Sequence, residues 1–96
     1  MRIRYTPDAF EDLEGIRAFL SERDGEDRAR VNGQRIRASI EPLATFPLLG
    51  QMGETPDTRI RIVTGAPYVV VYRIAEDEDV IEILHVYHGR QNWRSG

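Results

Sequence analysis

The chain has 96 residues, 13 basic and 16 acidic side chains, a net charge of −3 and no cysteine. This length predicts a single domain over residues 1–96 with one modest core, and the missing cysteines exclude disulfides and thiolate chemistry. All basic residues are arginine, so any anion site must be built from guanidinium groups, and the acidic balance argues against an autonomous nucleic-acid binder. No apolar run approaches the roughly 18 residues that span a bilayer, and the N-terminus has no signal-like segment. We therefore expect a cytoplasmic protein without membrane contact.

The first quarter of the chain predicts a short strand and a helix. Residues 2–5 alternate polar and apolar side chains, as a half-buried strand does. Thr6 before Pro7 is typical of a helix N-cap and first helical position, and Gly25 is expected to end this helix. Its apolar stripe is predicted to face the core, with an outer edge open to a partner. The stripe consists of Phe10, Leu13, Ile16, Phe19 and Leu20.

A second helix is predicted to begin at Glu26 and to form a hairpin with the first. Gly33 inside it would allow a neighbouring helix to approach closely, at a cost of about 1 kcal/mol in helix propensity. Pro42 is expected to kink the helix before a last turn at Phe46-Pro47, because proline lacks an N–H and its ring clashes with the preceding turn. Residues 47–57 are rich in proline and glycine and predict a loop.

Three β-rich runs follow between residues 58 and 94, separated by turn signals at Gly65-Ala66-Pro67 and at residues 76–79. Connections this short predict antiparallel pairing. The order β-α-α-β-β-β therefore predicts an α+β two-layer domain, with a helical hairpin packed on a mainly antiparallel four-stranded sheet.

The last run contains apolar residues on both of its expected faces. Simple alternation directs Ile81 and Ile83 to one face and Leu84 and Val86 to the other. The helical hairpin covers only one face, so we expect apolar surface to remain on the second face of the sheet. Surface of this kind is typical of a partner site.

Four segments, in this order and spacing, resemble the ParE/RelE superfamily of toxins from bacterial type II toxin–antitoxin modules. They are Phe46 to Gln51, Arg59 to Arg61, Tyr68 to Arg73 and Ile83 to Arg90. The resemblance covers nearly the whole chain and implies a toxin silenced by a cognate antitoxin in a hetero-oligomer.

The resemblance implies two alternative targets. ParE-like members poison DNA gyrase, whereas RelE-like members cleave mRNA in the ribosomal A site. The Pro47-x-x-Gly50-Gln51 loop, the strand of residues 68–73 and the absence of lysine favour a ParE-like, non-enzymatic gyrase inhibitor without a cofactor. A third hypothesis is a module that binds its protein partner and is no longer toxic.

His88, Tyr87 and Arg61 are candidate catalytic residues only under the ribonuclease hypothesis. Histidine is a suitable acid or base, tyrosine stacks on a nucleobase, and arginine clamps a phosphate. The resemblance places such histidines and arginines at the positions of His88 and Arg61, but ParE-like members also have a histidine there, so a structural His88 is equally consistent. Glu54 is either a loop base or a solvated carboxylate. His85 and His88 should point to opposite faces, so we expect no metal site.

The remaining candidates are target-binding or antitoxin-binding residues. Arg59 and Arg61 should share one face, as an anion or carboxylate clamp or as a solvated pair on an edge strand. A tail with Trp93 between arginines is a possible protein contact, because Trp and Arg dominate such sites, or folds back on the sheet. The complete set is Arg59, Arg61, Arg90, Trp93, Arg94, Phe10 and Leu13.

Overall fold

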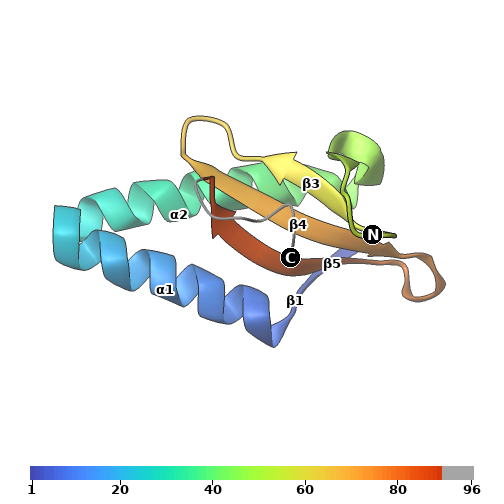
Figure 1. The fold of residues 1–96 in the computed structure, drawn as a ribbon, viewed down its shortest axis with the longest axis horizontal. Coiled ribbons are helices and arrows are strands. Elements are labelled where there is room, and N and C mark those ends of the chain that lie inside the picture. Colours follow the sequence, from blue (N-terminus) through green and yellow to red (C-terminus); the bar gives the residue numbers. More distant parts are fainter. Residues whose placement is uncertain (90–96) are drawn as a thin grey trace.

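The computed structural model describes residues 1–89 and has the predicted α+β architecture, with a helical hairpin on one face of a sheet (Figure 1). The elements run in the order β1 (Arg2–Tyr5), α1 (Pro7–Asp24), α2 (Glu26–Ile40), η1 (Glu41–Ala44), η2 (Pro47–Leu49), β2 (Gln51–Met52), β3 (Arg59–Ile62), β4 (Tyr68–Ala75), η3 (Glu76–Glu78) and β5 (Val80–His88). The three elements η1 to η3 are single 3-10 turns. No helix within residues 1–89 has the length and apolar composition needed to cross a membrane.

The sheet has five strands rather than the predicted four, in the order β1-β5-β4-β3-β2. β1 pairs with β5 in parallel, and every other pair is antiparallel. The additional strand, β2, is two residues long: Gln51 pairs with Ile60, and Met52 with Arg59. Two residues are too few for a recognisable alternation, so the sequence predicts only a loop there.

The predicted boundaries of α1 are confirmed. The Thr6 hydroxyl accepts a 3.2 Å hydrogen bond from the Ala9 N–H, and Pro7 is the first helical residue. Gly25, with a φ of 95°, separates α1 from α2. The predicted kink at Pro42 was wrong: α2 ends at Ile40, and Pro42 lies in the 3-10 turn η1. A proline ring in a continuing α-helix would collide with the carbonyl four residues earlier, and the tighter turn avoids this.

The main core lies between the hairpin and the sheet, and Val70, Tyr72, Ile81 and Ile83 of β4 and β5 are fully buried in it. The predicted stripe of α1 faces this core only in part, because Phe10 and Phe19 are 62% and 57% exposed. Successive steps of three residues drift by about 60° around a helix, so residues nine positions apart point in opposite directions. Side chains at these positions therefore cannot all face the sheet.

A β-bulge in β5 changes which side chains face the helices. Val71 of β4 lies opposite His85, whereas the next residue of β4 lies opposite Ile83, so Leu84 is the extra residue. Because the extra residue reverses the alternation, Val86 packs in the main core, while Leu84 and His85 both lie on the other face. The prediction that Leu84 and Val86 share a face was wrong, since it assumed uninterrupted alternation.

The face of the sheet away from the helices exposes less apolar surface than the sequence predicts. Ile60, Val69 and Val71 form a small cluster there that is 6%, 4% and 9% exposed, and Leu84 and Tyr87 pack against it. The prediction of a bare apolar sheet was therefore wrong. Two of the exposed large apolar side chains, Met52 and Ile62, lie toward the margin of this face, and the others lie on α1 and between η1 and β2. The exposed large apolar side chains within residues 1–89 are Phe10, Phe19, Phe46, Leu48, Leu49, Met52 and Ile62.

Candidate functional site: a sheet-face pocket and a helical groove

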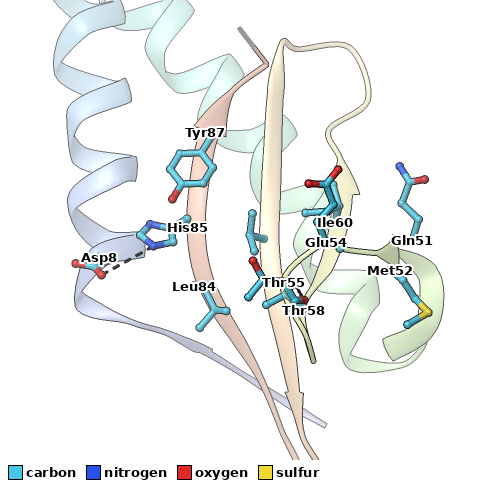
Figure 2. Close-up of a pocket in the computed structure, with 12 residues that line it drawn as sticks. Asp8, Gln51, Met52, Glu54, Thr55, Thr58, Ile60, Leu84, His85 and Tyr87 are labelled. Carbon is cyan, nitrogen blue, oxygen red and sulfur yellow. Dashed lines mark hydrogen bonds and ion pairs between the residues drawn. The ribbon is translucent and has the colours of Figure 1, made fainter. Parts of the chain in front are cut away.

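A pocket of about 410 Å³ opens on the face of the sheet away from the helices (Figure 2). Its floor consists of Ile60, Val71 and Leu84. One side is formed by Asp8 at the start of α1 together with His85 and Tyr87 of β5. The opposite side is formed by residues 51–55 and Thr58, which belong to β2 and the turn that follows it.

Asp12 of α1 holds the β5 side of this pocket in place. One carboxylate oxygen accepts a 3.0 Å hydrogen bond from the Val86 N–H and lies 3.1 Å from Nδ1 of His85. β1 ends opposite Ile83, so the Val86 N–H on the open edge of β5 needs a side-chain acceptor. Asp8, one helical turn earlier, lies 4.0 Å from Nε2 of His85. The two aspartates thus orient the imidazole ring.

The rings of His85 and Tyr87 stack on one another along one side of the pocket. Their centroids are 4.9 Å apart, and the planes differ by 15°. The pKa of the Tyr87 hydroxyl is raised mainly by burial and further by the negative charges of Asp12 and Asp8. Among residues 1–89 the lining includes the carboxylates of Asp8 and Glu54 and no arginine, so this part of the lining carries a negative formal charge.

The structure does not bring the three candidate catalytic residues together. Tyr87 faces the pocket, whereas the ring of His88 packs edge-on against Tyr68 of the main core, with centroids 5.7 Å apart. Arg61 donates a 3.2 Å hydrogen bond to the Ser39 carbonyl on the helical side. His85 and His88 point to opposite faces, and residues 1–89 contain no group of three potential metal ligands.

Sequence reasoning missed the residues that do converge on the pocket. It considered His85 only as a metal partner of His88, and it gave Asp8 and Asp12 no site role. The available signal was their spacing of four on α1, which places both carboxylates on one side of the helix. Glu54, considered only as a possible loop base, lines the pocket.

Arg59 and Arg61 both engage backbone carbonyls on the helical side of β3. Arg59 donates a 2.7 Å hydrogen bond to the Gly50 carbonyl, and Arg61 donates one of 3.2 Å to the Ser39 carbonyl. Because β2 pairs with β3, Arg59 does not lie on an edge strand, which corrects that alternative. A role of these arginines in target or antitoxin binding stays a prediction.

Tyr72 fixes the loop that leads into the pocket. Its hydroxyl donates a 2.6 Å hydrogen bond to the Pro47 carbonyl and accepts one of 2.9 Å from the Gly50 N–H. A Cβ on Gly50 would lie 2.6 Å from the Ile60 carbonyl oxygen and 2.7 Å from the Tyr72 ring. The Pro47-x-x-Gly50 spacing therefore serves to seat this loop against β4.

A second cavity, of about 670 Å³, lies between α1 and α2 on the outside of the hairpin. Phe10, Leu13 and Ile16 line it from α1, and Gly33 and Ile36 from α2. No heavy atom lies within 4 Å of a Cβ built on Gly33, so the prediction that Gly33 permits close packing of a neighbouring helix was wrong for this chain's own helices. The charged rim consists of Glu14, Arg17, Glu26, Arg30 and Arg37.

Comparison with known proteins decides the family. The sequence model of one protein family, described as the ParE toxin of the type II toxin–antitoxin system parDE, matches residues 3–93. The chain belongs to the ParE toxin family.

Relatives of this ParE family member agree with that assignment. It is 37% identical over 92 residues to a candidate toxin, Y4kP, of Sinorhizobium fredii, covering 96% of this chain and 92% of that protein. It is 30% identical over 74 residues to toxin ParE1 of Caulobacter vibrioides, covering 77% of each. A solved chromosomal ParDE toxin–antitoxin system from P. aeruginosa has the same fold, with a TM-score of 0.81, 23% identity and coverage of 92% of this chain and 95% of that chain.

The remaining candidates of this ParE family member fall into two groups. Phe10 and Leu13 both line the groove, and their role in partner binding stays a prediction. Arg90, Trp93 and Arg94 lie outside the described residues, and their proposed contact with a partner stays a prediction.

Proposed function

We propose that this chain is a cytoplasmic toxin that inhibits DNA gyrase without chemistry of its own and that a cognate antitoxin neutralises by occupying the groove between α1 and α2. The observation that supports this proposal best is the groove itself. Within residues 1–89, Phe10 at its edge is 62% exposed, and Leu13 and Ile16 are partly exposed.

The groove suits an amphipathic helix of a protein partner. Leu13 and Ile16 supply a partly exposed apolar floor with Ile36 buried beneath it, and the rim offers both carboxylates and guanidinium groups. A helix that lays its apolar face into such a groove gains affinity from buried area and register from the charged rim. Within the proposal, toxin and antitoxin form a hetero-oligomer through this contact.

Gyrase is favoured as the target over ribosomal mRNA. A ribonuclease site needs a free cation at the phosphate and an acid or base beside it. Arg61 and His88 both lie on the helical side of the sheet, but Arg61 bonds the Ser39 carbonyl and the ring of His88 packs on Tyr68, while Tyr87 lies on the opposite face. The histidine of the sheet-face pocket, His85, stands among carboxylates that would repel a phosphate backbone. Inhibition through protein contacts needs neither group.

Two assays on the purified chain test the target. We expect inhibition of gyrase supercoiling, or trapping of a gyrase–DNA cleavage complex, at toxin concentrations that leave ribosome-bound mRNA intact. Cleavage in the ribosomal A site that is lost in His88→Ala would instead support the endoribonuclease. Normal growth when the chain is expressed without antitoxin would exclude both toxic activities and leave a module that only binds its partner.

A further inference from the structure

We propose that the sheet-face pocket binds the guanidinium group of an arginine side chain that the antitoxin presents. This inference deepens the proposed function and rests on it for the identity of the partner. It concerns a site separate from the groove, on the other face of the molecule.

The shape of the pocket suits a planar group. Its volume of about 410 Å³ exceeds that of one side chain end, and the stacked rings of His85 and Tyr87 line one side of it. A guanidinium group is planar, is weakly hydrated and stacks on aromatic faces, whereas a lysine ammonium is a compact and strongly hydrated charge. A guanidinium group could extend this aromatic stack, which favours arginine over lysine.

The charge of the pocket suits a cation. Asp8 and Glu54 line opposite sides, Asp12 lies behind His85, and none of the lining residues that the structure describes is an arginine. Asp8 is 4.0 Å from the ring of His85, so this carboxylate retains hydrogen-bonding capacity for a ligand. Carboxylates on two sides match the several N–H donors of one guanidinium group. The apolar floor of Ile60, Val71 and Leu84 would hold the aliphatic part of the same side chain.

The position of the pocket indicates which partner supplies the arginine. The first turns of α1 separate the two cavities: Asp8 lines the pocket, while Phe10 and Leu13 line the groove. A polypeptide that leaves the groove at this end of α1 therefore reaches the pocket directly. A single antitoxin chain could thus hold both faces of the toxin at once, and two linked contacts bind more tightly than either alone.

A small-molecule probe tests the pocket without the antitoxin. Nα-acetyl-argininamide has the guanidinium group as its only charge, and Nα-acetyl-citrullinamide is its neutral analogue of the same shape. We expect argininamide, titrated into the full-length chain, to shift the backbone NMR signals of Glu54, Thr58 and Tyr87 saturably, with a smaller effect from Nα-acetyl-lysinamide. Equal shifts by citrullinamide, shifts confined to the groove or no shifts at all would each overturn the inference.

Variants then test the two carboxylates. Glu54→Gln should weaken argininamide binding about threefold, and Asp8→Asn combined with Glu54→Gln about tenfold, in line with partly exposed charge pairs. Glu22→Gln removes the same charge from an exposed position of α1 and should change nothing. Glu54 lies in a turn, so its variant is expected to fold even if the Asp8 change weakens the start of α1. Weakening by Glu22→Gln as large as that by Glu54→Gln would show a general charge effect and contradict the inference.

Growth arrest and neutralisation by antitoxin are measured separately on the unaltered chain. If it arrests growth and is neutralised but does not bind argininamide, only the arginine pocket fails. If argininamide binds and growth is unaffected, the pocket stands and the proposed toxin function fails.

Discussion

The hydroxyl of Tyr72, in the middle of β4, donates a 2.6 Å hydrogen bond to the carbonyl oxygen of Pro47. The same hydroxyl accepts from the Gly50 N–H, and Tyr72 is fully buried. Burial raises the pKa of this hydroxyl, so it stays protonated and able to donate at physiological pH. One side chain thus positions η2 and β2, and through them one side of the sheet-face pocket.

Tyr72→Phe should lower the free energy of unfolding by about 1–3 kcal/mol, because the Pro47 carbonyl and the Gly50 N–H lose a buried partner. Urea unfolding at pH 7 measures the loss. Tyr68→Phe is the matched control, since Tyr68 is also buried but its hydroxyl makes no hydrogen bond within residues 1–89. Equal losses in both variants would contradict the assigned role of the Tyr72 hydroxyl.

Gly50→Ala should destabilise the chain by more than 1 kcal/mol, because the added methyl would overlap the Ile60 carbonyl and the Tyr72 ring. The backbone at Gly50 has a φ of −77°, which any residue adopts, so the requirement for glycine is steric. Gly15→Ala is the control: its methyl meets open space in α1 and should stabilise the helix by up to about 1 kcal/mol. A Gly50→Ala variant as stable as the unaltered chain would show that the loop moves freely off β4.

Phe10→Asp should weaken antitoxin binding by at least 2 kcal/mol, about 30-fold, because it places a charge in the apolar groove. Phe46→Asp is a matched control, since Phe10 and Phe46 are each 62% exposed and only Phe10 lines the groove. Both variants should fold, and calorimetric titration with the antitoxin separates them. A larger loss from Phe46→Asp would move the antitoxin site to the surface around η2.

Glu82→Gln should lower the free energy of unfolding at pH 7, and this loss should shrink as the pH falls into the acid range. Hydrogen bonds from Arg73 and then Arg4 hold the pKa of Glu82 below its ordinary value of about 4.3. A lowered folded-state pKa stabilises the fold above the unfolded-state pKa, and this contribution disappears as the pH falls through the folded-state pKa. Both arginines are over 40% exposed, so we expect Glu82→Gln to lower the free energy of unfolding at pH 7 by no more than about 1 kcal/mol.

Urea unfolding of the unaltered chain and Glu82→Gln across this pH range provides the measurement. Added salt should reduce the difference in the free energy of unfolding between the two proteins at pH 7, because exposed charges are screened. If the difference in the free energy of unfolding is as large at pH 3 as at pH 7, the effect comes from side-chain packing rather than charge.

The sequence by itself determined the features that depend on neighbours in the chain. Thr6, Pro7 and Gly25 delimit α1 through local backbone preferences, and the short turns after β3 and β4 fix antiparallel pairing. The order and spacing of four segments, from Phe46 to Gln51 through Ile83 to Arg90, were sufficient to indicate the family.

Only the tertiary structure decided the site. The Asp12 contact with His85 joins residues 73 positions apart, and no local pattern encodes it. The bulge at Leu84 depends on how β5 pairs with β4, and it alone places His85 beside Tyr87 on the pocket face and Val86 in the core. Alternation is a property of a single strand, whereas register is a property of two strands. The faces of β5, and with them the convergent residues, were therefore set by pairing.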